Sequence, residues 1–276
     1  MNIFLTGGTG FIGKQFIKQA TKEGNYIFAT TRKSKKKKIK NVKWLVGPFE
    51  NNWKELKNSD VLIHLAAVGT YKKYVSFKRC NTVNVIKSSK LLYNAINANC
   101  SKLIIIGTGF EYQFYNRTLS TLEKNKTSAF VNYSLSKFIF SNICLNISKK
   151  LKLKCRIVKL FHVYGKGEKK HRLYPSLIKA AKNGKDFLMT NGNQRRDFSK
   201  VEDVAKGILS MTNFRKNEKN FPQIWDLASG KYSSVKSFAK NIWKEERAEG
   251  KLIFNKIKDY DANSYLPNKK IIWKIN

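Results

Sequence analysis

A glycine-rich segment near the start of the chain sets the strongest limit on its fold. Residues 6–13 read TGGTGFIG; they follow an apolar stretch and run into a helix-like pattern over residues 11–23. In this context Gly7 permits a tight turn, Gly10 lets the backbone approach a pyrophosphate, and Gly13 lets helix and strand pack closely. The N–H groups and positive dipole end of the helix would face the phosphates. The segment therefore predicts a dinucleotide-binding turn between a strand and a helix.

Length and composition indicate one large α/β domain, or one domain with a smaller lobe, because 276 residues that are 42% hydrophobic can bury a sizeable core. No apolar run of ~20 residues predicts a membrane span, and the start of the chain lacks the pattern of a signal peptide. The cysteines form no C-x-x-C pair, so we expect no metal site, and reduced thiols in a cytoplasmic protein. They are Cys80, Cys100, Cys144 and Cys155.

The formal net charge of +37 comes from 55 Lys and Arg against 18 Asp and Glu. Such a balance suggests a polyanionic partner. The lysines are spread along nearly the whole chain, which favours the simpler interpretation of lysine-rich, solvated faces. The one dense cluster, RKSKKKKIK at residues 32–40, has no aromatic residues that could stack on bases. We therefore expect a solvated loop there, and nucleic acid is not an expected partner.

Apolar strand-like runs alternate with helical patterns, which predicts βαβ units and a parallel sheet covered on both faces. After about residue 165 the pattern is mixed. We predict a Rossmann-like doubly wound parallel sheet in residues 1–165 and a smaller, interwoven substrate lobe, mostly in residues 166–276. The expected strands are residues 2–6, 25–31, 42–46, 60–65, 102–107, 155–161, 186–190 and 223–227. The expected helices are residues 11–23, 51–57, 82–98, 131–150, 173–183, 202–213 and 234–247, with a loop over the site at 110–130.

A tyrosine and a lysine four residues apart open the predicted helix at residues 131–150. The segment is YSLSK, with Tyr133 and Lys137 on one helical face. A nearby ammonium favours the phenolate, so we expect the pKa of Tyr133 to lie below its reference of about 10. Tyr133 would then serve as a proton donor and acceptor near neutral pH. Alone, the pair fits an ordinary amphipathic helix; together with the glycine motif, catalysis is the favoured interpretation.

Further motifs follow in a fixed order. HLAA stands at residues 64–67, Asn84 lies in NTVNVIKSSKLLYNA, and Thr108 lies in IIIGTGFEYQ; RDFSKVEDVA at 196–205 and WDLASG at 225–230 come later. With these motifs, nearly the full length of the chain resembles the extended short-chain dehydrogenase/reductase family, the NAD(P)-dependent epimerase/dehydratases of nucleotide sugars.

The resemblance implies a role for each matching residue. Thr108, Tyr133 and Lys137 would be catalytic: Thr108 binds the substrate oxygen, Tyr133 passes the proton, and Lys137 holds the nicotinamide ribose. The implied cofactor-binding residues are Gly7, Gly10, Phe11, Ile12, Gly13, Arg32, Lys33, Leu65, Ala66, Ala67, Asn84, Tyr133 and Lys137. Substrate would meet Thr108, His162 and Arg196, where a guanidinium suits a phosphate. A surface salt bridge of Arg196 with Asp197 or Asp203 is an equal alternative.

Cofactor choice is read where the second strand ends. NAD-binding proteins usually place Asp or Glu there for the ribose 2′-hydroxyl. This strand ends in Arg32 and Lys33 without a carboxylate, and Gly47-Pro48 replaces the family's Gly-Asp pair near the adenine. Cations suit a 2′-phosphate, so we expect NADP, with NAD as the other option.

Two departures from the family's motifs narrow the class of reaction. Thr108 is followed by Gly109, Phe110 and Glu111 instead of the Asp-Glu pair of family dehydratases, so a dehydratase is not expected and Glu111 is taken as structural. His162 stands in FHVYG, where family members often carry Asn. The GTGFEY string resembles reductases that act on CDP-linked or related keto sugars.

We therefore expect reduction of a nucleotide-linked keto sugar, with epimerisation second. A different class, a non-catalytic Rossmann protein that binds nucleic acid, is the further alternative. The helices at 82–98 and 131–150 resemble those through which family members pair, which predicts a homodimer.

Overall fold

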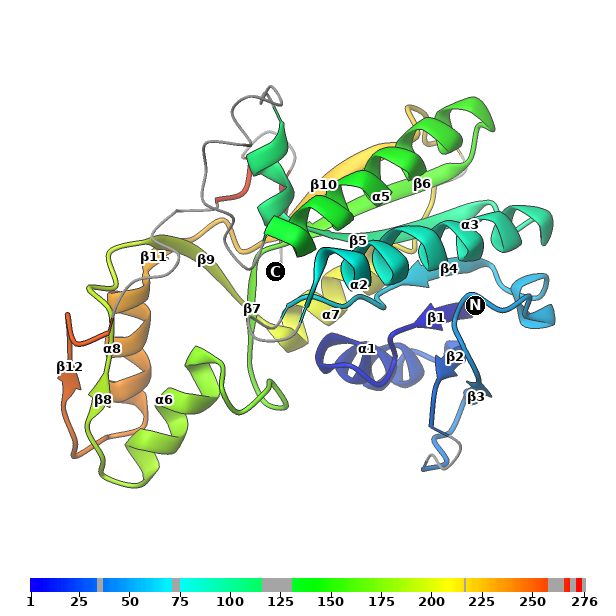
Figure 1. Cartoon of the computed structure of the whole chain (residues 1–276). Helices are drawn as coiled ribbons and strands as arrows, with labels where there is room; N and C mark the ends of the chain where they lie inside the picture. The colour runs from blue at the N-terminus through cyan, green and yellow to red at the C-terminus, as the bar shows by residue number, and fades with distance from the viewer. Residues whose placement is uncertain are drawn as a thin grey trace.

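A parallel sheet of eight strands forms the centre of the molecule, in the order β13-β10-β6-β5-β4-β1-β2-β3 (Figure 1). The computed structural model describes residues 1–33, 37–70, 75–115, 131–215, 217–257, 266–268 and the backbone of 272–274. The strands are β1 (Asn2–Thr6), β2 (Tyr26–Thr31), β3 (Val42–Val46), β4 (Val61–His64), β5 (Lys102–Thr108), β6 (Lys154–Leu160), β10 (Gln223–Ala228) and β13 (Ile272–Lys274). The order reverses beside β1, so the loops after β1 and β4 border a crevice, where ligands bind in such sheets.

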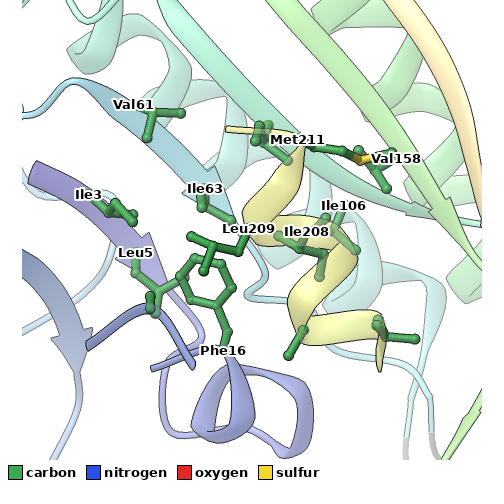
Figure 2. Close-up of a cluster of buried hydrophobic side chains, with 14 of the residues drawn as sticks. Ile3, Leu5, Phe16, Val61, Ile63, Ile106, Val158, Ile208, Leu209 and Met211 are labelled. Carbon is green, nitrogen blue, oxygen red and sulfur yellow. The ribbon is translucent and has the colours of Figure 1, made fainter. Parts of the chain in front are cut away.

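Both faces of the sheet are apolar, since alternate strand residues point to opposite faces. On one face, Ile3 and Leu5 of β1 pack with Phe16 of helix α1 (Phe11–Lys22) and with Ile208 and Leu209 of helix α7 (Val201–Ser210), as Figure 2 shows. On the other face, Phe4 packs in a cluster with residues of α3 (Ser88–Asn97) and α5 (Val131–Lys150). Two-sided burial explains why the strands read as continuous apolar runs.

A smaller group of elements lies beyond the carboxyl end of β6. It holds α6 (Leu173–Lys182) and α8 (Val235–Glu245), the pair β8 (Phe187–Leu188) and β12 (Leu252–Ile253), and a sheet of β7 (His162–Tyr164), β9 (Arg195–Lys200) and β11 (Tyr232–Ser234) (Figure 1). Phe198 of β9 stacks on Phe238 of α8, with ring centroids 3.9 Å apart. These contacts give the group its own apolar core.

The predicted doubly wound parallel sheet is confirmed, with its early strands close to the expected residues. The predicted helix at 51–57 is wrong: only a 3₁₀ turn, η1 (Lys54–Leu56), forms. The segment starts with two asparagines after a proline, and Asn51 closes a turn onto the Pro48 carbonyl; asparagine favours such turns over helix interiors.

Other departures are additional helical segments. The start of the loop expected at 110–130 lies in a 3₁₀ helix, η3 (Gly109–Phe114), and residues 116–130 lie outside the described residues. The segment before α3 is helical from residue 77, as α2 (Phe77–Asn81) and the π-helical η2 (Thr82–Lys87). The first half of the motif beginning at Arg196 lies in strand β9, and its second half begins α7. The division of the chain at residue 165 remains a prediction. Among the described residues, no helix combines the length and the apolar character needed to span a membrane.

Candidate active site

The glycine-rich turn is packed more tightly than any side chain would allow. Gly7 has φ +74°, and a Cβ there would lie 2.7 Å from the backbone nitrogen of Ala66. A Cβ on Gly13 would lie 2.2 Å from the Gly7 carbonyl oxygen. The Gly10 amide donates to that same oxygen at 2.9 Å, closing the turn. The turn after β1 therefore lies directly against the loop after β4.

The first turn of α1 suits an anion. Its N-cap residue, Gly10, provides no side-chain hydrogen bond, and the turn holds no acidic residue. The N–H groups of a helix start need an outside acceptor, and the helix dipole favours a negative one. This donor set fits a dinucleotide pyrophosphate, with Phe11 and Ile12 following as the first residues of the helix.

The loop after β4 is fixed by two buried polar residues. His64 accepts or donates at both ring nitrogens, 2.7 Å from Thr6 Oγ1 and 2.8 Å from Ser88 Oγ, and Thr6 Oγ1 accepts from the Ala66 amide at 3.2 Å. Asn84 binds both backbone groups of Val68, at 2.9 and 2.8 Å. These bonds hold Leu65, Ala66 and Ala67 at the crevice.

The side-chain amide of Asn84 thus forms its hydrogen bonds within the protein. Its nitrogen also donates to Ser136 Oγ at 2.9 Å, and the side chain is buried. Contact of Asn84 with a cofactor remains a prediction. Arg32 and Lys33 follow β2 with exposed side chains. The Lys33 amide donates to Thr31 Oγ1 at 3.2 Å, which bends the backbone at the edge of the crevice.

The structure brings Thr108 and Tyr133 together. Thr108 is the last residue of β5 and Tyr133 lies in the first turn of α5, and the Thr108 hydroxyl lies close enough to the Tyr133 phenol to lower its pKa. Gly69 lets the loop after β4 close on this pair, since a Cβ there would lie 2.9 Å from Tyr133 Cβ. Lys137 follows one helical turn later, 2% exposed. The three predicted catalytic residues therefore share one buried corner beside the cofactor crevice.

The expectation that the pKa of Tyr133 lies below its reference value is wrong. Burial raises the pKa of Tyr133 above its usual value, and the Glu111 carboxylate raises it further; Arg172 and the Thr108 hydroxyl act in the opposite direction. Burial lowers the pKa of Lys137, while Glu111 opposes that change. The Tyr-x-x-x-Lys spacing predicts that the two residues lie on one helical face, but it does not predict that both are buried. Tyr133 is therefore a phenol at neutral pH, which suits a proton donor.

His162 and Arg196 lie together on neighbouring strands, β7 and β9. Arg196 Nε donates to His162 Nε2 at 3.2 Å, so the proton of the neutral imidazole is on Nδ1. Burial lowers the pKa of His162 to about 3, and Arg196 and Arg172 contribute to the same shift. No residue in the described part of the chain accepts from Nδ1. His162 is thus an uncharged donor.

The alternative of a surface salt bridge for Arg196 is wrong, because its side chain is 2% exposed. The neighbouring Asp197 is committed elsewhere: its two carboxylate oxygens accept from Ser199, from both Ser229 groups and from the Gly230 amide, at 2.8–3.0 Å. Asp197 therefore fixes the turn after β10 and leaves Arg196 beside His162.

Sequence reasoning missed part of this corner. Glu111 is fully buried, and its Oε1 accepts from the Thr108 amide at 2.8 Å. Lys159, on β6, is also fully buried. The signals were present: a carboxylate three residues after a threonine forms a capping box, and Lys159 interrupts an apolar strand.

Known proteins resemble this chain in both sequence and fold. The sequence model of the NAD dependent epimerase/dehydratase family matches residues 3–227. CDP-abequose synthase of Salmonella muenchen is 25% identical over 92% of this chain and 84% of its own length.

Solved structures are similar over nearly the whole fold. UDP-N-acetylglucosamine 4-epimerase of Methanobrevibacter ruminantium, in complex with UDP-N-acetylmuramic acid, gives a TM-score of 0.80 at 21% identity, covering 98% of this chain and 90% of that one. A UDP-glucuronic acid 4-epimerase variant of Bacillus cereus, in complex with a fluorinated UDP-sugar and NAD, gives 0.80 at 19% identity, covering 98% and 91%.

Proposed function

Because the chain belongs to the NAD dependent epimerase/dehydratase family, we propose that it reduces a nucleotide-linked keto sugar with NADPH, Tyr133 donating the proton. The observation that carries this proposal is the buried Thr108–Tyr133 pair beside the cofactor crevice. When bound, the nicotinamide supplies the hydride. Thr108 would hold the substrate carbonyl oxygen against the Tyr133 hydroxyl, which then passes its proton to that oxygen as the alcohol forms.

Several features support the other parts of the site. The uncapped start of α1 would hold the pyrophosphate, and Lys137 the ribose hydroxyls. Arg196 and the Nδ1–H of His162 together offer one cation and one neutral donor, a combination suited to the diphosphate and to a sugar hydroxyl. A relative that makes CDP-abequose supports a CDP-linked sugar as the first to test.

Epimerisation is the second candidate, since the similar solved structures include nucleotide-sugar 4-epimerases. Stoichiometry separates the two reactions. A reductase consumes one NADPH per product, which absorbance at 340 nm records; an epimerase converts substrate without net consumption of cofactor. The panel should hold CDP-, UDP- and GDP-linked sugars and 4-keto sugars.

Tyr133→Phe is the decisive variant. It removes only the hydroxyl, and we expect turnover to fall by about 100-fold or more, the usual share of a general acid, while cofactor binding is retained. Turnover equal to that of the unaltered protein would refute the enzyme assignment. Salt-sensitive RNA binding without turnover would favour the nucleic-acid alternative.

The preference for NADP rests on Arg32 and Lys33. Replacing both by Ala should weaken NADPH about 10-fold or more, because charge-assisted bonds to a 2′-phosphate are lost, and should leave NADH unchanged. Lys40→Ala, in the same exposed segment, is the matched control. Equal efficiency with both cofactors in the unaltered protein would remove the proposal.

Pairing of two copies is proposed through the outer face of α2, η2 and α3. Phe77, Ile86 and Tyr93 are exposed there at 46%, 59% and 64%. Exposed large apolar side chains favour association. Light scattering should give twice the chain mass, and Ile86→Lys should restore the monomer. The cytoplasmic location remains a prediction from the cysteines, which are free and buried.

A further inference from the structure

A second set of buried charges lies directly behind Thr108. Glu111 belongs to η3 (Gly109–Phe114), and its carboxylate caps that short helix by accepting from the Thr108 amide at 2.8 Å. Gly107 makes room for it, since a Cβ at that position would lie 2.5 Å from Glu111 Oε1. Gly107 is the register partner of Lys159 on the adjacent strand. The carboxylate thus occupies a space between β5, β6 and α5.

Lys159 faces the same space from β6. Its ammonium lies 4.0 and 4.1 Å from the ring centroids of Tyr112 and Tyr115, an arrangement that stabilises a cation. No hydrogen bond to Nζ occurs within the described residues. Beyond the rings, the Tyr112 hydroxyl donates to Asp226 at 2.7 Å. Two buried cations, Lys137 and Lys159, therefore face two buried carboxylates, Glu111 and Asp226.

The two carboxylates share one cation, Lys159, but only Glu111 also acts on Lys137. Glu111 is the carboxylate that opposes the effect of burial on Lys137, and it acts on Tyr133 in the direction that retains the phenol proton. The other titratable groups that face Glu111 are Tyr112 and Tyr115 on η3 and Cys144 on α5.

We propose that Glu111 is a positioning residue of the reaction: its bond to the Thr108 amide fixes Thr108 against Tyr133, and its buried carboxylate places a negative charge behind the Tyr133–Lys137 pair. This inference rests on the proposed function and extends it from the residues that touch substrate to the layer behind them. A proton donor must hold its proton until the hydride arrives. Burial raises the pKa of Glu111 itself, while Lys159 and Lys137 act in the opposite direction. In its ionised form the Glu111 carboxylate favours the protonated donor, because a buried negative charge opposes formation of a phenolate.

Glu111→Gln tests the charge while keeping an oxygen for the Thr108 amide. Losing a negative charge makes proton release easier from both neighbours, so the alkaline limb of the pH–rate profile should move to lower pH by about one unit or more. Glu111→Asp keeps the charge and should restore the position of the limb. Glu55→Gln, a buried carboxylate on η1 paired with Lys43, is the matched control and should leave the limb in place.

A purely structural role predicts a different result: turnover falls equally at every pH, and the limb stays. That result would overturn the proposal. Because Glu111→Gln removes the carboxylate that acts most strongly on the buried Lys159, the variant can impair folding. The double variant Glu111→Gln with Lys159→Met removes both charges together. This double variant should fold, by circular dichroism, and still show the displaced limb.

A readout without substrate separates this inference from the reaction itself. With lysine labelled at ¹³Cε, the resonance of Lys137, assigned by its loss in Lys137→Met, reports its protonation by NMR. It should titrate at a pH about one unit or more lower in Glu111→Gln. An unchanged titration would overturn the role of Glu111 even if reduction is established. If Tyr133→Phe leaves turnover intact while Lys137 shifts as expected, the reaction assignment fails and the electrostatic link stands.

Discussion

Gly13 allows the closest contact in the cofactor turn to be tested by one added carbon. Gly13→Ala places a Cβ 2.2 Å from the Gly7 carbonyl oxygen and 2.7 Å from Gly8 Cα. Both neighbours are backbone atoms, so no side chain can rotate away. Normal carbon contacts begin near 3.5 Å, so α1 and the turn must separate by roughly 1 Å.

Two effects of opposite sign set the magnitude. Ala is favoured over Gly inside a helix by about 1 kcal/mol, whereas forcing an extra carbon into a packed site costs about 1–3 kcal/mol. With only backbone to displace, we take the upper end, which leaves a net loss of about 2 kcal/mol in the free energy of unfolding. Urea denaturation measures this loss.

Gly10→Ala is the matched control. Its nearest neighbour would be 3.1 Å away and its φ of −75° suits any residue, so we expect a stability loss within about 1 kcal/mol, as for Ala at an N-cap. Both variants should weaken dinucleotide binding, but only Gly13→Ala should also unfold at a clearly lower urea concentration. If Gly13→Ala proves as stable as the unaltered protein, or more so, the gain in helix propensity exceeds the cost of the added carbon, and the close packing of α1 on the turn is refuted.

Two further predictions concern the buried charges and the histidines. Glu218→Ala should lower the free energy of unfolding by about 3 kcal/mol, measured in urea, because the buried Arg156 loses a partner at 2.5 Å; a loss under about 1 kcal/mol would show that the carbonyls of Met211 and Asn213 satisfy it. Because folding holds His64 and His162 at lowered pKa values, the unfolded chain takes up more protons below pH ~6.5, and stability should fall there by up to about 1.4 kcal/mol per pH unit for each. His162→Asn should remove its share of that slope, and an unchanged slope between pH 6.5 and 5 would contradict the neutral imidazole.

The parts of the site that sequence reasoning predicted are those fixed by a local motif or by the order of the motifs along the chain. The strand–turn–helix at residues 6–13 and the approach of Tyr133 to Thr108 both follow from motif order and parallel topology. The protonation state of Tyr133 does not follow from them, because it depends on burial and on the Glu111 carboxylate. That carboxylate fits behind the pair because residue 107 is a glycine and leaves room for it. The polar partners of Asn84 likewise come from distant segments: Val68 is 16 residues away in the chain and Ser136 is 52 residues away.

Short strands were hard to predict for a related reason. The motif after Arg195 matched a family pattern, yet its first half forms β9, which pairs with two three-residue strands. Such strands lack the length for an alternating pattern, so their pairing is decided by contacts between distant segments.

Helix α7 has a consequence for anyone who wishes to exchange specificity between relatives of this enzyme. Its sequence directly follows the strand that carries Arg196, but Ile208 and Leu209 pack in one cluster with Phe16 of α1 (Figure 2). In a chimaera cut at residue 165, α1 of one parent would therefore pack against α7 of the other parent. Mismatched side chains in that contact would shift α1, whose first turn is proposed to bind the dinucleotide. Grafts that retain residues 201–210 from the parent of α1, and replace only the segments around α6 and α8, respect the packing.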